Sequence, residues 1–392
     1  MHKHLNNCII IVLLILLVLS TASCSEANTP QSDVFDSKNE NVLSIGRKVL
    51  FPIAEANDVI YFCPTFMDHG NLWFYDLKDG YAAPFCAKPD CQHDSETCGA
   101  YFMNSTLKGI SVYDNKLWYT AIGPSRDDPY SRIYWQELNG GPRNQRHIFT
   151  NEEISEATGD GRSFFYGGYY LKSGSGTEVI DEVPFRPARV IAYDLETDER
   201  IEILNKRFDM FSEVCIEPFD KWLYISVCGL NLGDEEQSFT LYRWNLETRE
   251  LEELYSGKVG HQFTEIWVED DRVFLVDNTS PDVYCYSMDS GTFSLAWTAN
   301  INDERWLFYC FSEDSIIFQK ADPRGLALKI MDFSGNTVAQ HSYDYKKGSL
   351  LFFDCGADDQ YAYRMEYPVG GKGGRLLAIP LDGSEIKTLW SN

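Results

Sequence analysis

VIAYDLETDE (residues 190–199) and LYRWNLETRE (residues 241–250) follow one pattern, in which a strand-like run ends in Leu directly before a polar turn. The pattern recurs along the chain at intervals of between 42 and 61 positions. Repeats of this length are typical of stacked supersecondary units. The last apolar residues of the seven copies are Leu77, Leu138, Leu195, Leu246, Met288, Phe333 and Leu381.

A second unit precedes the copies and consists of a short apolar strand, a turn that carries Asp or Gly, and an aromatic strand. ISVYDNKLWY (residues 110–119) and IWVEDDRVFL (residues 266–275) are two examples. Together the two units supply four antiparallel strands per repeat, which is the content of a propeller blade. We therefore expect an all-β fold, a single β-propeller over residues 43–392 with seven four-stranded blades. Six or eight blades are the alternatives, because a terminal strand could complete a neighbouring blade.

The run Tyr-Asp-Leu before a turn, at residues 75–77 and 193–195, resembles the exported TolB-like propellers. The layout of the chain also resembles uncharacterised β-propeller lipoproteins of Firmicutes. This resemblance implies the propeller fold and an exported protein. It implies no particular activity, because one fold serves many functions.

The N-terminus has the composition of an export signal. Residues 8–19 form an apolar run that is too short to cross about 30 Å of hydrocarbon. Small residues then precede Cys24, which resembles the bacterial lipoprotein signal, in which this cysteine is lipidated. Secretory cleavage after Ala27 is the alternative. We expect a signal peptide (1–23), a flexible tether (24–42) and lipid attachment at Cys24, with the protein on the outer face of the cytoplasmic membrane, or secreted.

Acidic residues dominate the charge of the chain. It contains 59 Asp and Glu against 34 Lys and Arg, a formal net charge of −25. Such a surface repels nucleic acid and anionic lipid, so we expect no nucleic-acid partner and membrane contact only through the N-terminal lipid. We expect a monomeric domain.

Four cysteines and a histidine gather in the first repeat: Cys63, Cys86, Cys91, His93 and Cys98. Thiolate and imidazole are ligands that zinc prefers, and the spacing from His93 to Cys98 matches a zinc knuckle. Disulfides are an alternative because an exported domain meets oxidising conditions, and free thiols are a third. We expect residues 84–100 to be a structural insertion after the third strand of the first blade, held by disulfides or by zinc. No other cofactor is expected.

No Gly-x-Ser-x-Gly, His-Glu-x-x-His or phosphate-binding loop motif occurs in the chain. In a propeller, the loops between the second and third strands share one face with the connections between blades, and variable loops on a rigid scaffold usually carry function. These loops differ in length here, whereas the opposite turns are short. The candidate binding residues on them are Asp68, His69, Arg126, Asp181, Arg186, Glu235, His261 and Arg324.

These observations predict a tethered binding module at the cell surface. Its variable-loop face would engage a protein, peptide or glycan of the cell envelope. The alternative is an exported carbohydrate-active hydrolase or lyase with carboxylates at the channel mouth. An acid pair near His69 or His261 would favour the enzyme, and a broad aromatic face without such a pair would favour binding.

Overall fold

The computed structural model describes residues 53–64, 69–103, 107–122, 131–149, 163–175, 178–180, 183–299, 306–322, 325–344, 349–368 and 374–391. In these ranges the elements are β-strands, without a helix. No helix there is long and apolar enough to span a bilayer. The predicted signal peptide, the tether and Cys24 lie outside the described residues.

Blades 1 to 4 are antiparallel sheets of consecutive strands. Blade 1 contains β1 (Ile53–Ala56), β2 (Val59–Phe62), β4 (Trp73–Asp76) and β5 (Tyr81–Pro84). Blade 2 contains β7 (Lys108–Tyr113), β8 (Lys116–Ile122), β9 (Ser131–Glu137) and β10 (Asn144–Ile148). Blade 3 contains β11 (Ser163–Tyr166), β12 (Tyr169–Ser175), β14 (Val183–Asp194) and β15 (Arg200–Phe208). Blade 4 contains β16 (Phe211–Phe219), β17 (Trp222–Leu230), β18 (Gln237–Asn245) and β19 (Leu251–Val259).

Blades 5 to 7 repeat the same order. Blade 5 contains β20 (Glu265–Glu269), β21 (Arg272–Val276), β22 (Asp282–Ser287) and β23 (Thr292–Thr298). Blade 6 contains β24 (Leu307–Phe311), β25 (Ser315–Asp322), β26 (Gly325–Asp332) and β27 (Thr337–Asp344). Blade 7 contains β28 (Ser349–Ala357), β29 (Tyr361–Pro368), β30 (Arg375–Pro380) and β31 (Lys387–Ser391).

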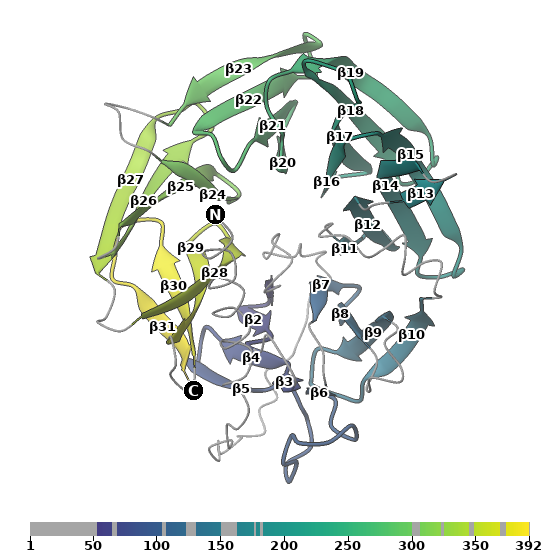
Figure 1. Ribbon diagram of the computed structural model, residues 1–392. Helices are drawn as coiled ribbons and strands as arrows, with labels where there is room; N and C mark the ends of the chain where they lie inside the picture. The colour runs from purple at the N-terminus through teal and green to yellow at the C-terminus, as the bar shows by residue number, and fades with distance from the viewer. Residues whose placement is uncertain are drawn as a thin grey trace, which may run out of the picture.

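The seven blades stand in a ring around a central channel, with the first strand of each blade inside and the fourth outside (Figure 1). The chain therefore folds as a seven-bladed β-propeller, which confirms the fold and the blade number predicted from the repeats. Side chains of the inner strand β16 are mostly buried, whereas those of the outer strand β19 are mostly exposed or half-buried. Two additions depart from the plain blade: β13 (Glu178–Ile180) extends blade 3 by pairing with β14, and β3 (His69–Asn71) pairs with β6 (Tyr101–Met103).

In four of the seven copies, Asp or Asn stands before the last apolar residue and closes the turn between the third and fourth strands. Asp194 Oδ1 accepts hydrogen bonds from the backbone N–H groups of Glu196 and Thr197, each at 2.9 Å. Side chains of this type favour turns because they hydrogen-bond the backbone two or three residues ahead. Asp76, Asn245 and Asp332 make equivalent contacts.

The last apolar residue of the pattern joins the two turns of its own blade. The backbone N–H of Leu195 donates to Gly168 O at 2.9 Å, in the turn between the first two strands of blade 3. The same bond is made in other blades by Leu77, Leu246, Met288 and Leu381. The repeat seen in the sequence thus forms a hydrogen-bonded corner in blades 1, 3, 4, 5 and 7.

The hydrophobic core lies between blades. The described buried residues form seven clusters, one at each boundary between neighbouring blades. The boundary between blades 7 and 1 closes the ring. There the ring of Trp390 from β31 meets Phe62 and Trp73 of blade 1 edge to face, with centroid distances of 6.1 and 5.7 Å. None of the described strands pairs across this boundary, so side-chain contacts close the ring there.

We expect Trp390→Ala to lower the free energy of unfolding by about 3–5 kcal/mol, the usual cost of removing a buried Trp side chain. Urea denaturation followed by far-ultraviolet circular dichroism measures this change. Leu295→Ala, on the outer strand β23 with Leu295 51% exposed, is the control and should change stability by no more than about 0.5 kcal/mol. Equal effects of the two substitutions would contradict closure through Trp390.

Candidate functional site

A group of one imidazole and three thiols follows the outermost strand of blade 1. We call Cys86, Cys91, His93 and Cys98 the thiol–imidazole group. They lie between β5 and β6. The sequence predicted this insertion after the third strand of the blade, and that position is wrong. Residues 81–84 pair with β4 as a short fourth strand before the insertion begins.

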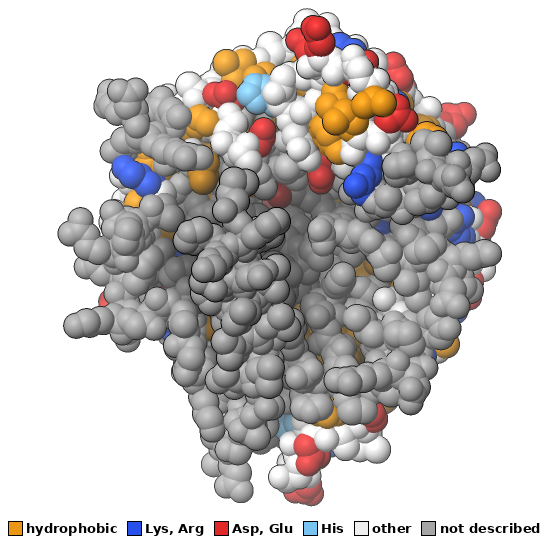
Figure 2. Space-filling model, viewed as in Figure 1, with side chains coloured by type: hydrophobic (Ala, Val, Ile, Leu, Met, Phe, Trp, Pro, Cys, Tyr) orange, Lys and Arg blue, Asp and Glu red, His pale blue; other side chains and the backbone are white. Residues whose placement is uncertain are grey.

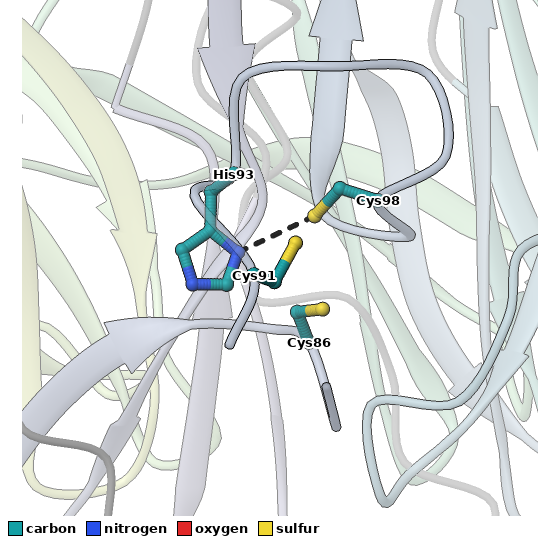
Figure 3. A group of neighbouring side chains, drawn as sticks. All are labelled: Cys86, Cys91, His93 and Cys98. Atoms are coloured by element: carbon teal, nitrogen blue, oxygen red, sulfur yellow. Dashed lines mark hydrogen bonds between the residues drawn. The ribbon is translucent and has the colours of Figure 1, made fainter. Parts of the chain in front are cut away.

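The four side chains point toward a common centre (Figure 3). One potential ligand atom from each residue can be chosen so that all four lie within 4.8 Å of one another. His93 Nδ1 lies 3.3 Å from Cys98 Sγ. Cys98 is buried and the other three side chains are half-buried. This arrangement brings together four of the five residues that the sequence grouped.

Local backbone geometry places these atoms. His93 has a φ of 54°, in the left-handed region that non-glycine residues seldom adopt. Two short turns flank it, in which Cys91 N–H donates to Lys88 O at 3.3 Å and Cys98 N–H donates to Ser95 O at 2.9 Å. The chain therefore doubles back twice within a few residues, which lets distant positions in the segment face each other.

Hydrogen bonds within the group shift the pKa values of Cys86 and Cys98 in opposite directions. Hydrogen bonding lowers the pKa of Cys86. The Cys98 thiol has the largest effect, and His93, the backbone of Lys88 and Cys91 have smaller ones. The hydrogen bond to Cys86 and then burial raise the pKa of Cys98.

Cys63 lies apart from this group. It directly follows β2 and is 4% exposed, in the core between blades 1 and 2. No disulfide links Cys86, Cys91 or Cys98 to another described cysteine. The metal-competent set in the described part of the chain is therefore the thiol–imidazole group.

The predicted loop residues that the structure describes come from different parts of the ring. Asp68, Arg126, Asp181 and Arg324 lie outside the described residues, and His69 begins β3. His261 lies before blade 5, with its Nδ1 4.0 Å from Asp277 Oδ2 and its ring centroid 5.0 Å from that of Tyr284.

Arg186 lies in β14 of blade 3, paired with Phe208, and Glu235 lies in the loop between β17 and β18 of blade 4; both are exposed. Arg186 Nε donates to Met210 O at 3.4 Å. Met210 is 48% exposed and Leu232, on the loop after β17, is 81% exposed. Figure 2 shows hydrophobic side chains beside acidic and basic ones at the upper right of this face, where Figure 1 draws β17 and β18. The sequence predicted the charged residues Arg186 and Glu235 in this region but not Met210 and Leu232. An apolar residue within a polar loop was the sequence feature that could have identified them.

A carboxyl pair lies at the inner strands of blades 1 and 7. Glu55 belongs to β1, and Asp358 directly follows β28. Burial, followed by the charge and hydrogen bond of Asp358, raises the pKa of Glu55 to about 8. Asp358 also accepts a hydrogen bond from the Tyr363 hydroxyl. His261 lies in the connection that leads into blade 5, so it is not part of this pair.

Comparison with known proteins shows the fold. No protein-family model and no curated protein matches the chain. It is similar to acylaminoacyl peptidase from Pyrococcus horikoshii, with a TM-score of 0.52 and 12% identity over 89% of this chain and 52% of that chain. It is also similar to prolyl oligopeptidase B from Galerina marginata, with a TM-score of 0.51 and 11% identity over 90% of this chain and 51% of that chain. The chain spans about half the length of either peptidase, and at this identity the likeness shows the β-propeller alone.

We expect the raised pKa of Glu55 to make stability depend on pH. The folded state holds this proton up to a pH of about 8, whereas the unfolded chain loses it near 4.5. The free energy of unfolding should therefore fall as the pH rises through this window, by up to about 5 kcal/mol at about 1.4 kcal/mol per pH unit. Glu55→Gln should flatten that fall, measured by urea denaturation between pH 4.5 and 8.5.

The exposed Glu253 on β19 provides the matched control. Glu253→Gln should keep the pH slope of the wild type. A wild-type slope that Glu55→Gln leaves unchanged would show that the pair does not titrate in this range.

Proposed function

We propose that this protein is a tethered binding module of the cell envelope that engages a cationic segment of a partner protein or peptide. The binding surface would be the blade 4 loop patch, which we define as Arg186, Asp209, Met210, Leu232 and Glu235. The observation that carries the proposal is the 81% exposure of Leu232 on an ordered loop. The TolB-like lipoprotein character and the lipid anchor at Cys24 belong to the same proposal.

Hydrogen bonds hold the apolar side chains of the patch in place. Met210 N–H donates to Leu230 O at 3.0 Å. The side chain of Asp209 accepts from Leu232 N–H at 3.4 Å, and the backbone N–H of Asp209 donates to Asn231 Oδ1 at 3.3 Å. The connection between blades 3 and 4 is thus tied to the loop after β17. A loop fixed in this way loses little conformational entropy when a partner binds it.

Acidic groups surround the apolar centre. Asp209, Asp234, Glu235 and Glu236 occupy the two connected loops, and the nearby Lys258 Nζ lies 3.7 Å from Asp234 Oδ2. An apolar centre with a charged rim is typical of protein interfaces. The whole chain carries a formal charge of −25, which attracts a cationic partner at long range. These charges favour a basic partner segment with an apolar anchor side chain.

The competing function is an exported hydrolase or lyase. The two peptidases that share the fold are enzymes by name. In this chain, the carboxyl pair nearest the inner strands, Glu55 and Asp358, is joined by a hydrogen bond. Glycosidases instead separate their carboxyl groups by about 5–5.5 Å or by about 6.5–9.5 Å. A hydrogen-bonded pair of this kind lacks the separation that glycoside hydrolysis requires, so Glu55 and Asp358 do not themselves support a glycosidase.

Site-specific crosslinking in cells tests the binding surface. A photo-crosslinking amino acid at position 232 should capture a partner, and the same amino acid at Asp382, in a turn of blade 7, should not. With the captured partner purified, Leu232→Ala should weaken binding about tenfold, because a central apolar anchor contributes most of the affinity. Its stability should change by no more than about 0.5 kcal/mol, since Leu232 is exposed.

Association kinetics of a charge variant test this surface further. Arg186→Glu should change the association rate and its salt dependence, because it alters charge at the rim of the patch. Capture from position 382 alone, or a partner that binds Leu232→Ala as tightly as the wild type, would refute the blade 4 loop patch as the binding surface.

The anchor has its own test. Cys24→Ala should abolish lipid attachment, because the substitution removes the acceptor thiol. The expected result is loss of the protein from the membrane fraction, or an unprocessed precursor, measured by detergent phase partitioning and mass spectrometry of the N-terminus. Unchanged partitioning would refute the lipid anchor without affecting the binding surface.

A further inference from the structure

We propose that the thiol–imidazole group binds one Zn²⁺, and that the bound ion fixes the segment 86–98 against blade 2. The inference is independent of the proposed binding function. It concerns a metal site at the outer rim of the ring, where the segment after β5 meets the turn between β9 and β10 (Figures 1 and 3).

The donor atoms fit zinc in kind, number and spacing. Three sulfurs and one imidazole nitrogen complete a tetrahedral structural site without an open position. Zn–S bonds of about 2.3 Å place tetrahedral sulfurs about 3.8 Å apart. The four ligand atoms here already lie within 4.8 Å of one another, and the pair formed by His93 Nδ1 and Cys98 Sγ is at 3.3 Å. Shifts of a fraction of an ångström to about 1 Å would bring all four onto one ion.

A disulfide accounts for the group less well. Any disulfide among Cys86, Cys91 and Cys98 uses two sulfurs and leaves the third thiol facing the bridge. It also gives no reason for the left-handed backbone of His93, whose φ is 54°. A metal uses all four side chains, and the strained backbone at His93 then has the effect of aiming its imidazole at the ion.

Backbone groups around the sulfurs match a thiolate site. Ala100 N–H donates to Cys98 Sγ at 3.3 Å, and the backbone of Lys88 supports Cys86. Such hydrogen bonds orient metal-bound ligands and stabilise the negative charge on sulfur. On binding, each ligating thiol releases its proton to water. The site then carries a net charge of −1 from three thiolates, a neutral imidazole and Zn²⁺.

Contacts elsewhere in the ring show what this segment replaces. In other blades the outer strand contacts the turn between the third and fourth strands of the next blade. Arg146 of β10 donates to Leu195 O at 3.0 Å, and Trp297 of β23 donates to Phe333 O at 3.3 Å. The outer strand of blade 1, β5, has four residues and is the shortest of the seven outer strands, which elsewhere have between five (β10 and β31) and nine residues (β15 and β19).

The cysteine-rich segment makes the corresponding contact for blade 1. Ala87 N–H donates to Gly140 O at 2.7 Å, in the turn between β9 and β10. Arg143, from the same turn, donates to Glu96 Oε2 at 2.7 Å and to Tyr101 O at 2.9 Å. Gly140 has a φ of 76°, and a Cβ there would lie 3.2 Å from the backbone of Cys86. The segment thus fits closely on blade 2, and the metal would give it the rigidity that a longer strand supplies elsewhere.

The experiment uses the full chain, purified without chelator or oxidant. Native mass spectrometry should find one zinc per chain. Replacement by Co²⁺ should give the intense visible bands of tetrahedral cobalt with thiolate ligands. Removal of the metal should lower the melting temperature by several degrees, and added zinc should restore it. Cys91→Ser and His93→Ala should lose the bound metal, whereas Cys285→Ser, a half-buried cysteine of blade 5, should keep one zinc.

Arg143→Ala separates metal binding from the contact with blade 2. This variant should retain one zinc while melting at a lower temperature, and chelation should then lower its melting temperature by less than in the wild type, because both changes release the same contact. If Cys91→Ser does not fold, Co²⁺ titration of the reduced wild type tests metal binding instead. Reduced, folded wild type that takes up neither Zn²⁺ nor Co²⁺, or a disulfide between two of the three cysteines in natively purified protein, would overturn the proposal.

Discussion

Each blade of this propeller can bury its two faces only against its neighbours, so the stability of every sheet depends on the closure of the ring. The seven buried clusters lie between blades, and the last of them joins blade 7 to blade 1 through Trp390, Phe62 and Trp73. Loss of that contact would expose one face of each terminal blade. The loops and the thiol–imidazole group therefore depend on a ring that side-chain packing keeps closed.

The repeat in the sequence predicted the architecture because each of its residues has a local task. The Asp or Asn closes a turn through its side chain, and the following apolar residue joins two turns through its backbone N–H. Such short-range constraints can be read from one sequence. The position of the insertion could not be predicted in this way, because β5 has four residues and its sequence resembles the beginning of a loop.

The candidate sites also differ in how far local sequence could predict them. Cys86, Cys91, His93 and Cys98 lie within 13 positions, and their types alone suggested that they meet. The pairing of Glu55 with Asp358 joins the first blade to the last, a contact that exists only once the ring has closed. Met210 and Leu232 come from two different connections that hydrogen bonds bring together. Long-range sites of this kind depend on the geometry of the ring and leave little trace in local sequence.

Because each blade is completed by one continuous stretch of chain before the next begins, the boundary between blades 7 and 1 is the one that lacks a covalent connection between its described strands. The chain ends could in principle be moved to another boundary without dividing any sheet, and the seam of the ring would move with them. The aromatic side chains around Trp390 would then face a boundary that carries a peptide link, and a different pair of blades would have to associate without one. The demand for strong packing at this position is therefore a property of the order of the blades along the chain and not of the propeller itself.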